Sequence, residues 1–129
     1  MIWFPKMFLN TFMNINFITN KIMESVKLKD KVLKEVENLK ALNPVVLDVK
    51  NSGIFTDYIM VLTATSSTHM RAISQAIIKS LKDMNLSLLG SEGFDGEDWI
   101  LLDAGDAVVH IMSAEARSFY DLEGLWDLE

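Results

Sequence analysis

Apolar residues recur every three or four positions in two segments of the chain, which predicts two amphipathic helices. In the first segment, residues 24–42, the apolar stripe consists of Leu28, Val32, Val36 and Leu39. Asn43 and Pro44 are expected to end this helix, because proline disfavours helical geometry in the residue before it. The second helix follows Ser66 or Ser67, either of which can cap its N-terminus. Its apolar stripe consists of Met70, Ile73, Ile77, Leu81 and Met84.

Shorter apolar runs predict strands. They lie at residues 45–49, 58–63 and 86–90, and on both sides of the sequence DAGD. The acidic, glycine-containing loop SEGFDGED is expected to be exposed and mobile. A capped short helix and an amphipathic tail follow from residue 113. Because no internal repeat or linker interrupts the pattern, it predicts a single α/β domain with about five strands and flanking helices.

The segment WILLDAGDAVVHIM, residues 99–112, has the pattern of a β-hairpin. Gly105 is expected to adopt a positive φ in the turn, which is either a two-residue loop or a three-residue loop with a glycine bulge. In the second strand, alternation predicts a core face formed by Ala107, Val109 and Ile111. Asp106, Val108 and His110 are then expected to share the other face, as a recognition surface. The face that Trp99 joins depends on the turn.

The composition is that of an ordinary globular protein: half of the residues are hydrophobic and 23% are charged. The formal net charge of −6 makes a phosphate backbone an unfavourable partner and a basic protein surface a favourable one. Cysteine is absent, which excludes disulfides, thiolate metal sites and cysteine nucleophiles. The hairpin's acids and histidine are therefore the candidates for metal or proton chemistry.

Catalytic interpretations find little support in the sequence. The chain has 2 histidines, and neither lies in a motif that gathers the three or four ligands of a metal site. Asp103 and Asp106 are close enough in sequence to suggest a shared Mg²⁺, but aspartate is also common in turns, where it bonds its own backbone. Glycine-rich phosphate loops and a nucleophile elbow are absent. We therefore expect no catalytic residue, no metal and no cofactor.

Aromatic and apolar residues crowd the segment ARSFYDLEGLW, residues 116–126. Phe119 and Leu122 are expected to cover the sheet. Tyr120 and Trp126 are candidates for partner contact, since both types are enriched at protein interfaces. Arg117 has two alternatives: it pairs within the domain with Asp103, Asp106 or Glu123, or it binds a carboxylate of a partner.

The first 22 residues differ from the rest of the chain: they contain two lysines, no acidic residue and many Asn, Ile, Phe and Met. Polar residues interrupt this stretch too often for a membrane span, and it lacks the features of a secretory signal or a transit peptide. We expect a non-domain extension, disordered or loosely attached, with Met23 as the true start. A targeting or membrane-surface role is the alternative.

Several segments of the chain resemble the ribosomal silencing factors (the RsfS/Iojap family). They are LDV (47–49), TDY (56–58), TATSSTHMRAIS (63–74), LLGSEG (88–93), DWILLDAGDAVVHIM (98–112) and EARSFYDLEGLW (115–126). They run in order from Met23 to the C-terminus, so the resemblance assigns residues 23–129 to the silencing-factor domain. Thr68 departs from the family, which usually has an arginine there, and puts any role carried over to this position in doubt.

The resemblance implies a nucleotidyltransferase-like fold with a mixed sheet and without that superfamily's catalytic carboxylates. It also implies a cytoplasmic, non-enzymatic repressor that docks on protein fourteen of the large ribosomal subunit and blocks small-subunit joining when nutrients are scarce. Family members can form homodimers; direct DNA binding and a membrane are not expected. The alternative is a degenerate nucleotidyltransferase that binds nucleotide and Mg²⁺. The candidate partner-binding residues are Trp99, Asp103, Asp106, His110, Arg117, Tyr120 and Trp126.

Overall fold

The computed structural model describes residues 3–125, with side chains from residue 14 onward. Its elements, in chain order, are α1 (Trp3–Asn38), β1 (Leu42–Asp48), β2 (Tyr58–Thr63), α2 (Ser67–Asp83), β3 (Gly90–Glu92), β4 (Trp99–Asp103), β5 (Ala107–Met112), α3 (Ala114–Tyr120) and α4 (Leu122–Leu125). The strands form one mixed sheet in the order β1-β2-β5-β4-β3, in which only the β2–β5 pair is parallel. The predicted α/β domain with a five-stranded mixed sheet is confirmed.

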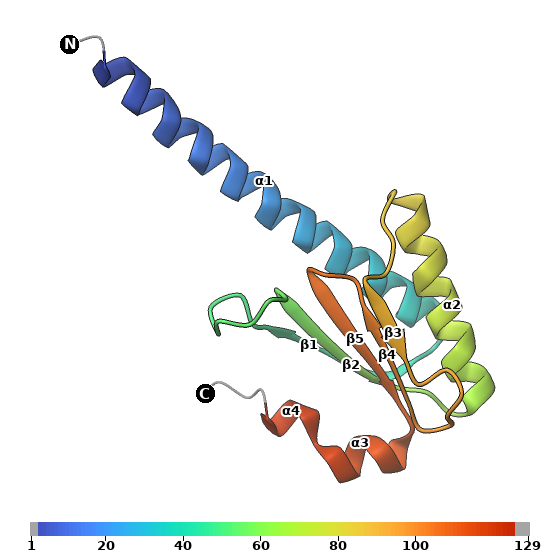
Figure 1. The fold of residues 1–129 in the computed structure, drawn as a ribbon. Coiled ribbons are helices and arrows are strands. Elements are labelled where there is room, and N and C mark those ends of the chain that lie inside the picture. Colours follow the sequence, from blue (N-terminus) through green and yellow to red (C-terminus); the bar gives the residue numbers. More distant parts are fainter. Residues whose placement is uncertain (1–2, 126–129) are drawn as a thin grey trace.

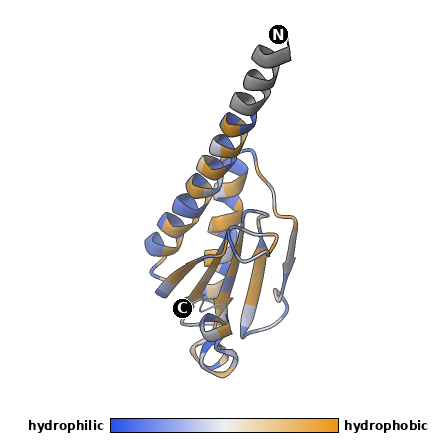
Figure 2. Ribbon diagram, turned by 90° about the vertical axis from the view of Figure 1, so that its left-hand side faces the viewer, coloured by the Kyte–Doolittle hydropathy of each residue, from blue (hydrophilic) through white to orange (hydrophobic). Residues whose placement is uncertain are grey.

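Helices cover both faces of this sheet, but unequally (Figure 1). The main core lies between one face and the helices α1 and α2, whose buried stripes include the predicted Leu28, Val32, Ile73 and Ile77. A smaller core lies on the opposite face, where Ala116 of α3 and Leu122 of α4 pack against the sheet. Apolar residues are accordingly concentrated in the central strands (Figure 2). We call the face covered by α1 and α2 the inner face, and the other the outer face.

Both long helices end where an asparagine or lysine takes the left-handed conformation. At the end of α1, Lys40 has φ 58°, and the N–H of Ala41 donates to the carbonyl of Val36 at 2.9 Å. At the end of α2, Asn85 has φ 59°, and the N–H of Leu86 donates to the carbonyl of Leu81 at 2.8 Å. These are Schellman caps, which satisfy carbonyls that the helix leaves unpaired.

The caps correct two predictions about boundaries. Lys40 ends the first helix before Pro44 is reached, and Pro44 lies inside β1, an edge strand where a missing N–H is tolerated. The strand predicted at residues 86–90 begins only at Gly90, because Leu86 belongs to the cap of α2. Ser66 is the residue that caps α2, and it accepts a hydrogen bond from the N–H of His69 at 3.0 Å.

The N-terminal extension is helical from Trp3, and α1 runs through it into the domain without a break. Helical geometry propagates readily from an anchored helix. The expectation that this extension is a non-domain segment, disordered or loosely attached, stays a prediction. The described side chains of residues 14–24 are all exposed, and α1 projects beyond the sheet (Figure 1). The boundary at Met23 and its role as the start remain predictions. Within residues 3–125, no helix is both long and apolar enough to cross a membrane.

Candidate partner-binding surface

The register of the β4–β5 hairpin determines the face on which each of its side chains lies. Trp99 pairs with Met112, Leu101 with His110, and Asp103 with Val108, which is the register of a two-residue loop. Gly105 has the expected positive φ, 86°. Paired residues of neighbouring strands share a face, so Trp99 joins His110 on the outer face. The predicted core face of β5 is confirmed: Ala107, Val109 and Ile111 are fully buried.

Three aromatic side chains meet at the end of this hairpin nearest α3. The ring centroids of Trp99 and Tyr120 are 5.0 Å apart, and those of Phe119 and Tyr120 are also 5.0 Å apart. Tyr120 is 53% exposed and Phe119 80% exposed, whereas Trp99 is half-buried. The prediction that Phe119 covers the sheet is therefore wrong, while Leu122 does pack there. We call Trp99, Phe119 and Tyr120 the aromatic patch.

His110 lies beneath this patch rather than in it. Its side chain is 9% exposed, and its Nδ1 accepts a hydrogen bond from the indole Nε1–H of Trp99 at 3.1 Å. Because Nδ1 is the acceptor, the neutral ring carries its proton on Nε2. Burial lowers the pKa of His110 to about 4, since desolvation disfavours the imidazolium. At neutral pH His110 is thus an uncharged hydrogen-bond acceptor.

Two shallow hollows flank Trp99. One, of about 370 Å³, is lined by the aromatic patch together with Asp98, Glu115 and Ala116. The other, of about 260 Å³, is lined by Glu92, Gly93, Trp99 and Leu101. The three acids bordering these hollows are exposed. Trp99 thus lies between two hollows that are bordered by carboxylates. Such a surface is suited to a partner that presents apolar and basic side chains.

The two hairpin aspartates lie away from the aromatic patch. Asp103 is on the outer face at the opposite end of β4, and its Oδ1 accepts the N–H of Gly105 at 2.9 Å, a turn-forming bond. Asp106 precedes β5, so strand alternation does not place it, and its predicted position beside His110 is wrong. Asp106 instead borders a hollow with Glu24, Lys27 and Leu28 of α1. Burial and the nearby charge of Asp57 raise the pKa of Asp106.

Arg117 is engaged within the domain. Its Nε donates to Glu123 at 2.7 Å and its Nη1 to the hydroxyl of Thr63 at 3.0 Å. Of the pairing alternatives within the domain, the structure thus selects Glu123. These contacts tie α3 and α4 to β2 and so support the surface that carries Tyr120. Trp126 lies outside the described residues.

The loop before Trp99 depends on two residues that the sequence did not single out. Arg71 of α2 reaches the carbonyl oxygen of Phe94 from Nε and Nη2, both at 3.4 Å. Gly93 has φ 96°, and a Cβ at this position would overlap the carbonyl oxygen of Trp99. The glycine is therefore required by both its conformation and its close approach to Trp99. An isolated arginine on a helix and one glycine among several gave no signal in the sequence.

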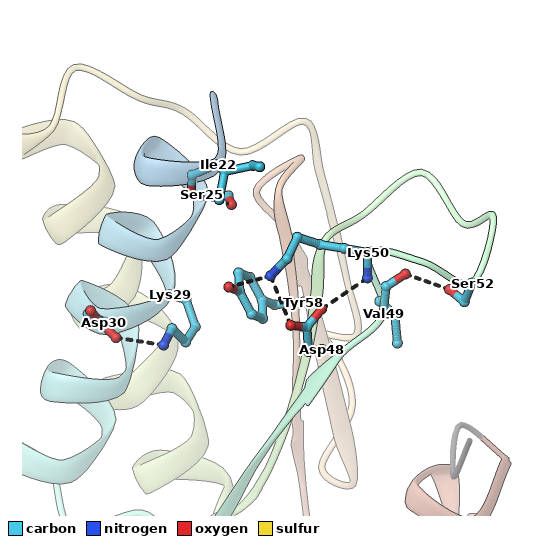
Figure 3. Close-up of polar contacts among 9 residues, drawn as sticks. All are labelled: Ile22, Ser25, Lys29, Asp30, Asp48, Val49, Lys50, Ser52 and Tyr58. Atoms are coloured by element: carbon cyan, nitrogen blue, oxygen red, sulfur yellow. Dashed lines mark hydrogen bonds and ion pairs between the residues drawn. The ribbon is translucent and has the colours of Figure 1, made fainter. Parts of the chain in front are cut away.

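A polar cluster at the start of the β1–β2 loop also escaped prediction (Figure 3). The Nζ of Lys50 donates to the hydroxyl of Tyr58 at 2.7 Å and to Oδ2 of Asp48 at 2.9 Å. Burial alone would lower the pKa of Lys50, but these two bonds raise it, and the bond from Lys50 lowers the pKa of Asp48. The arrangement keeps both groups charged and holds the loop against β2.

The other histidine, His69, makes hydrogen bonds that join two helices. His69 Nδ1 accepts the N–H of Thr65 at 2.9 Å, and its Nε2 lies 2.6 Å from the carbonyl oxygen of Leu39. It thus joins the start of α2 to the end of α1. Among the described residues, no three His, Asp or Glu side chains gather in a way that could hold a metal ion.

Comparison with known proteins identifies the family. The family model described as "Ribosomal silencing factor during starvation" matches residues 22–129 of the chain. The chain belongs to this family. The recognition made from the sequence motifs is thereby confirmed, and family membership places the chain among the ribosome-associated regulators of translation.

Individual silencing factors match most of the chain. The factor of Haemophilus influenzae is 36% identical over 95 residues, which cover 74% of this chain and 93% of that protein. The factor of Chromobacterium violaceum is 31% identical over 104 residues, covering 81% of this chain and 85% of that one. A mouse relative named "Mitochondrial assembly of ribosomal large subunit protein 1" is 34% identical over 86 residues, which cover 64% of this chain and 38% of that protein.

Solved structures agree with this fold. A crystal structure of a protein from Chromobacterium violaceum has a TM-score of 0.74 and 30% sequence identity, covering 78% of this chain and 83% of that one. A second, from Bacillus halodurans, has a TM-score of 0.69 and 29% identity, covering 78% of this chain and 93% of that one. The fold of this chain is therefore also that of these two solved structures.

Proposed function

We propose that this silencing factor docks on the large ribosomal subunit through its aromatic patch and thereby blocks joining of the small subunit. The observation that carries the docking site is the cluster of exposed Phe119 and Tyr120 against the half-buried Trp99. Exposed aromatic rings that meet at adjacent hollows are typical of the anchors that dominate binding energy in protein interfaces. Within the family, such docking would slow translation when nutrients are scarce.

The partner that fits this surface is a basic protein. The chain carries a net charge of −6, and Glu92, Asp98 and Glu115 border the hollows on either side of Trp99. The negative charge of this surface accelerates its encounter with a basic partner. The same charge repels the phosphate backbone of nucleic acid. Protein fourteen of the large subunit, which the resemblance to the family implies, is the proposed partner, reached from the cytoplasm. The name of the mouse relative, which refers to the ribosomal large subunit, supports the choice of subunit.

The geometry refines the set of proposed contacts. Trp99 and Tyr120 form the centre of the interface, and Trp126 remains a candidate beyond the described residues. His110 and Arg117 support the surface from below and from the side. Asp103 lies on the outer face at the far end of the hairpin, where contact requires a partner that spans the whole strand. Asp106 borders the hollow beside α1, so its contact requires a partner that also reaches around the turn. A homodimer through the same surface would compete with the ribosome.

Co-sedimentation with isolated large subunits tests this proposal. We expect the wild-type chain to sediment with the subunits and Trp99→Ala to lose about 30-fold in affinity, since truncating a central aromatic anchor costs on the order of 2 kcal/mol. Phe55→Ala is the matched control, because Phe55 is fully exposed on the β1–β2 loop, separated from β4 by β5 and β2. Equal affinity of the two variants would overturn the placement of the interface.

A further inference from the structure

We infer that His110 is a positioning residue: it holds the Trp99 indole in the orientation that docks the partner. This inference rests on the proposed function, and it changes the role of His110 from a contact to a support. The side chain is 9% exposed, so it offers the partner almost no surface. Its contribution to binding must therefore pass through the side chain above it, which is Trp99.

The indole of Trp99 is held from two directions. On one side, its Nε1–H donates to Nδ1 of His110 at 3.1 Å, with the ring centroids 5.6 Å apart. On another, its ring packs against Tyr120 at 5.0 Å. Nε1–H is the only hydrogen-bond donor of the indole, so this single bond fixes the rotation of the ring about its side-chain torsions. A ring fixed before binding loses less conformational entropy when the partner arrives.

The surroundings of His110 favour its neutral, accepting form. Its neighbours in register are Val61 on β2 and Leu101 on β4, and neither is titratable. From α3, Tyr120 approaches through Trp99, and Glu115 borders the hollow beside it; from β3, Glu92 pairs with Leu101; Asp98 precedes β4. No carboxylate among these makes a hydrogen bond to the ring, and burial lowers the pKa of His110 to about 4.

Protonation would reverse the arrangement. An imidazolium donates from both ring nitrogens and has no acceptor to offer. Protonated His110 would therefore present an N–H to the indole N–H, and Trp99 would be released from its position. The bond is consequently complete at neutral pH and is lost as the pH falls through about 4.

Two substitutions of His110 show whether it acts as a hydrogen-bond acceptor or only fills space beneath Trp99. His110→Phe keeps a buried ring but removes the acceptor, whereas His110→Asn places an amide oxygen close to the position of Nδ1. We expect the Phe variant to bind large subunits about tenfold more weakly, as loss of a buried hydrogen bond implies, and the Asn variant to recover most of that loss. Equal binding by the Phe variant and the wild type, or failure of a folded Asn variant to recover, would overturn the inference.

A second readout does not depend on the ribosome. In the free protein, the indole Nε1–H NMR signal of Trp99, assigned by its absence in Trp99→Phe, should shift as His110 titrates with a midpoint near pH 4. His110→Asn should show no such step, and methyl signals report whether the fold persists. A wild-type signal that does not move would overturn the inference. If this shift occurs but wild-type protein does not bind large subunits, the proposed function fails while the positioning of Trp99 stands.

Discussion

The geometry around Trp99 depends on the protonation state of His110 and on the absence of a Cβ at Gly93. Protonation of His110 matters because the ring is buried and its Nδ1 must remain free to accept the indole N–H. The missing Cβ of Gly93 matters because the backbone of Trp99 occupies the space that a side chain would need. Substitutions at these positions therefore test the construction of the surface without touching its exposed rings.

The burial of His110 predicts a pH-dependent stability. Its pKa is about 4 in the folded protein and about 6.5 in an unfolded chain, so the unfolded state binds the extra proton between these values. The corresponding stability is complete above pH 6.5 and is lost as the pH falls toward 4. Urea unfolding should show that the wild type loses roughly 2 kcal/mol more than His110→Asn between pH 7 and pH 5. An equal loss in both proteins would contradict the prediction.

Gly93 and Gly53 form a matched pair for testing the close approach. Both have positive φ, 96° and 80°, but a Cβ on Gly53 would meet nothing within 4 Å. Gly53→Ala should therefore cost only the strain of the backbone, about 1 kcal/mol, while Gly93→Ala should cost on the order of 3 kcal/mol or more. Urea unfolding of the two variants measures this difference. Similar costs would show that Trp99 can move aside.

At the scale of the elements, periodicity predicted what each segment is, and caps decided where it ends. The buried stripes of α1 and α2, the bounds of β2 and the two strands of the hairpin follow from alternation that the sequence displays directly. The start of β3 did not, because Asn85 adopts a left-handed conformation that converts an apolar run into a helix cap. Such a conformation depends on packing around the cap, which composition does not reveal.

The candidate site was predictable to a similar extent. Strand alternation placed His110 on the outer face, and residue type singled out Trp99 and Tyr120, which the structure brings together. Alternation could not show that Trp99 covers His110, because this contact joins residues on two strands and depends on the turn register. It also misplaced Asp106, which belongs to the turn, where the alternation of a strand no longer holds.

Residues 14–24 of α1 contribute no buried side chain to the fold. Residues 14–24 are exposed, whereas burial begins at Ser25 and continues with Leu28 and Val32. A chain that begins at Met23 should therefore have the same free energy of unfolding as the full chain, to within about 0.5 kcal/mol, when both are measured by urea unfolding. A clear loss of stability would place part of residues 1–22 in the folded domain and contradict Met23 as its boundary.

At the scale of the whole molecule, the two faces of the sheet differ in how completely helices cover them. The inner face is closed by α1 and α2 and provides the main core. The outer face is covered only in part by α3 and α4, which leaves the aromatic patch and its acidic rim available to a partner. In the proposed function, this exposed part of the outer face is the surface that docks on the large subunit.

A subunit-joining assay tests the central claim most directly. Large subunits are first incubated with the protein, small subunits are then added, and formation of the complete ribosome is followed by light scattering. We predict that the wild type and Phe55→Ala reduce joining to the same extent at equal concentration, and that Trp99→Ala requires about 30-fold more protein for that effect. Normal joining in the presence of saturating wild-type protein would contradict the account, as would undiminished inhibition by Trp99→Ala.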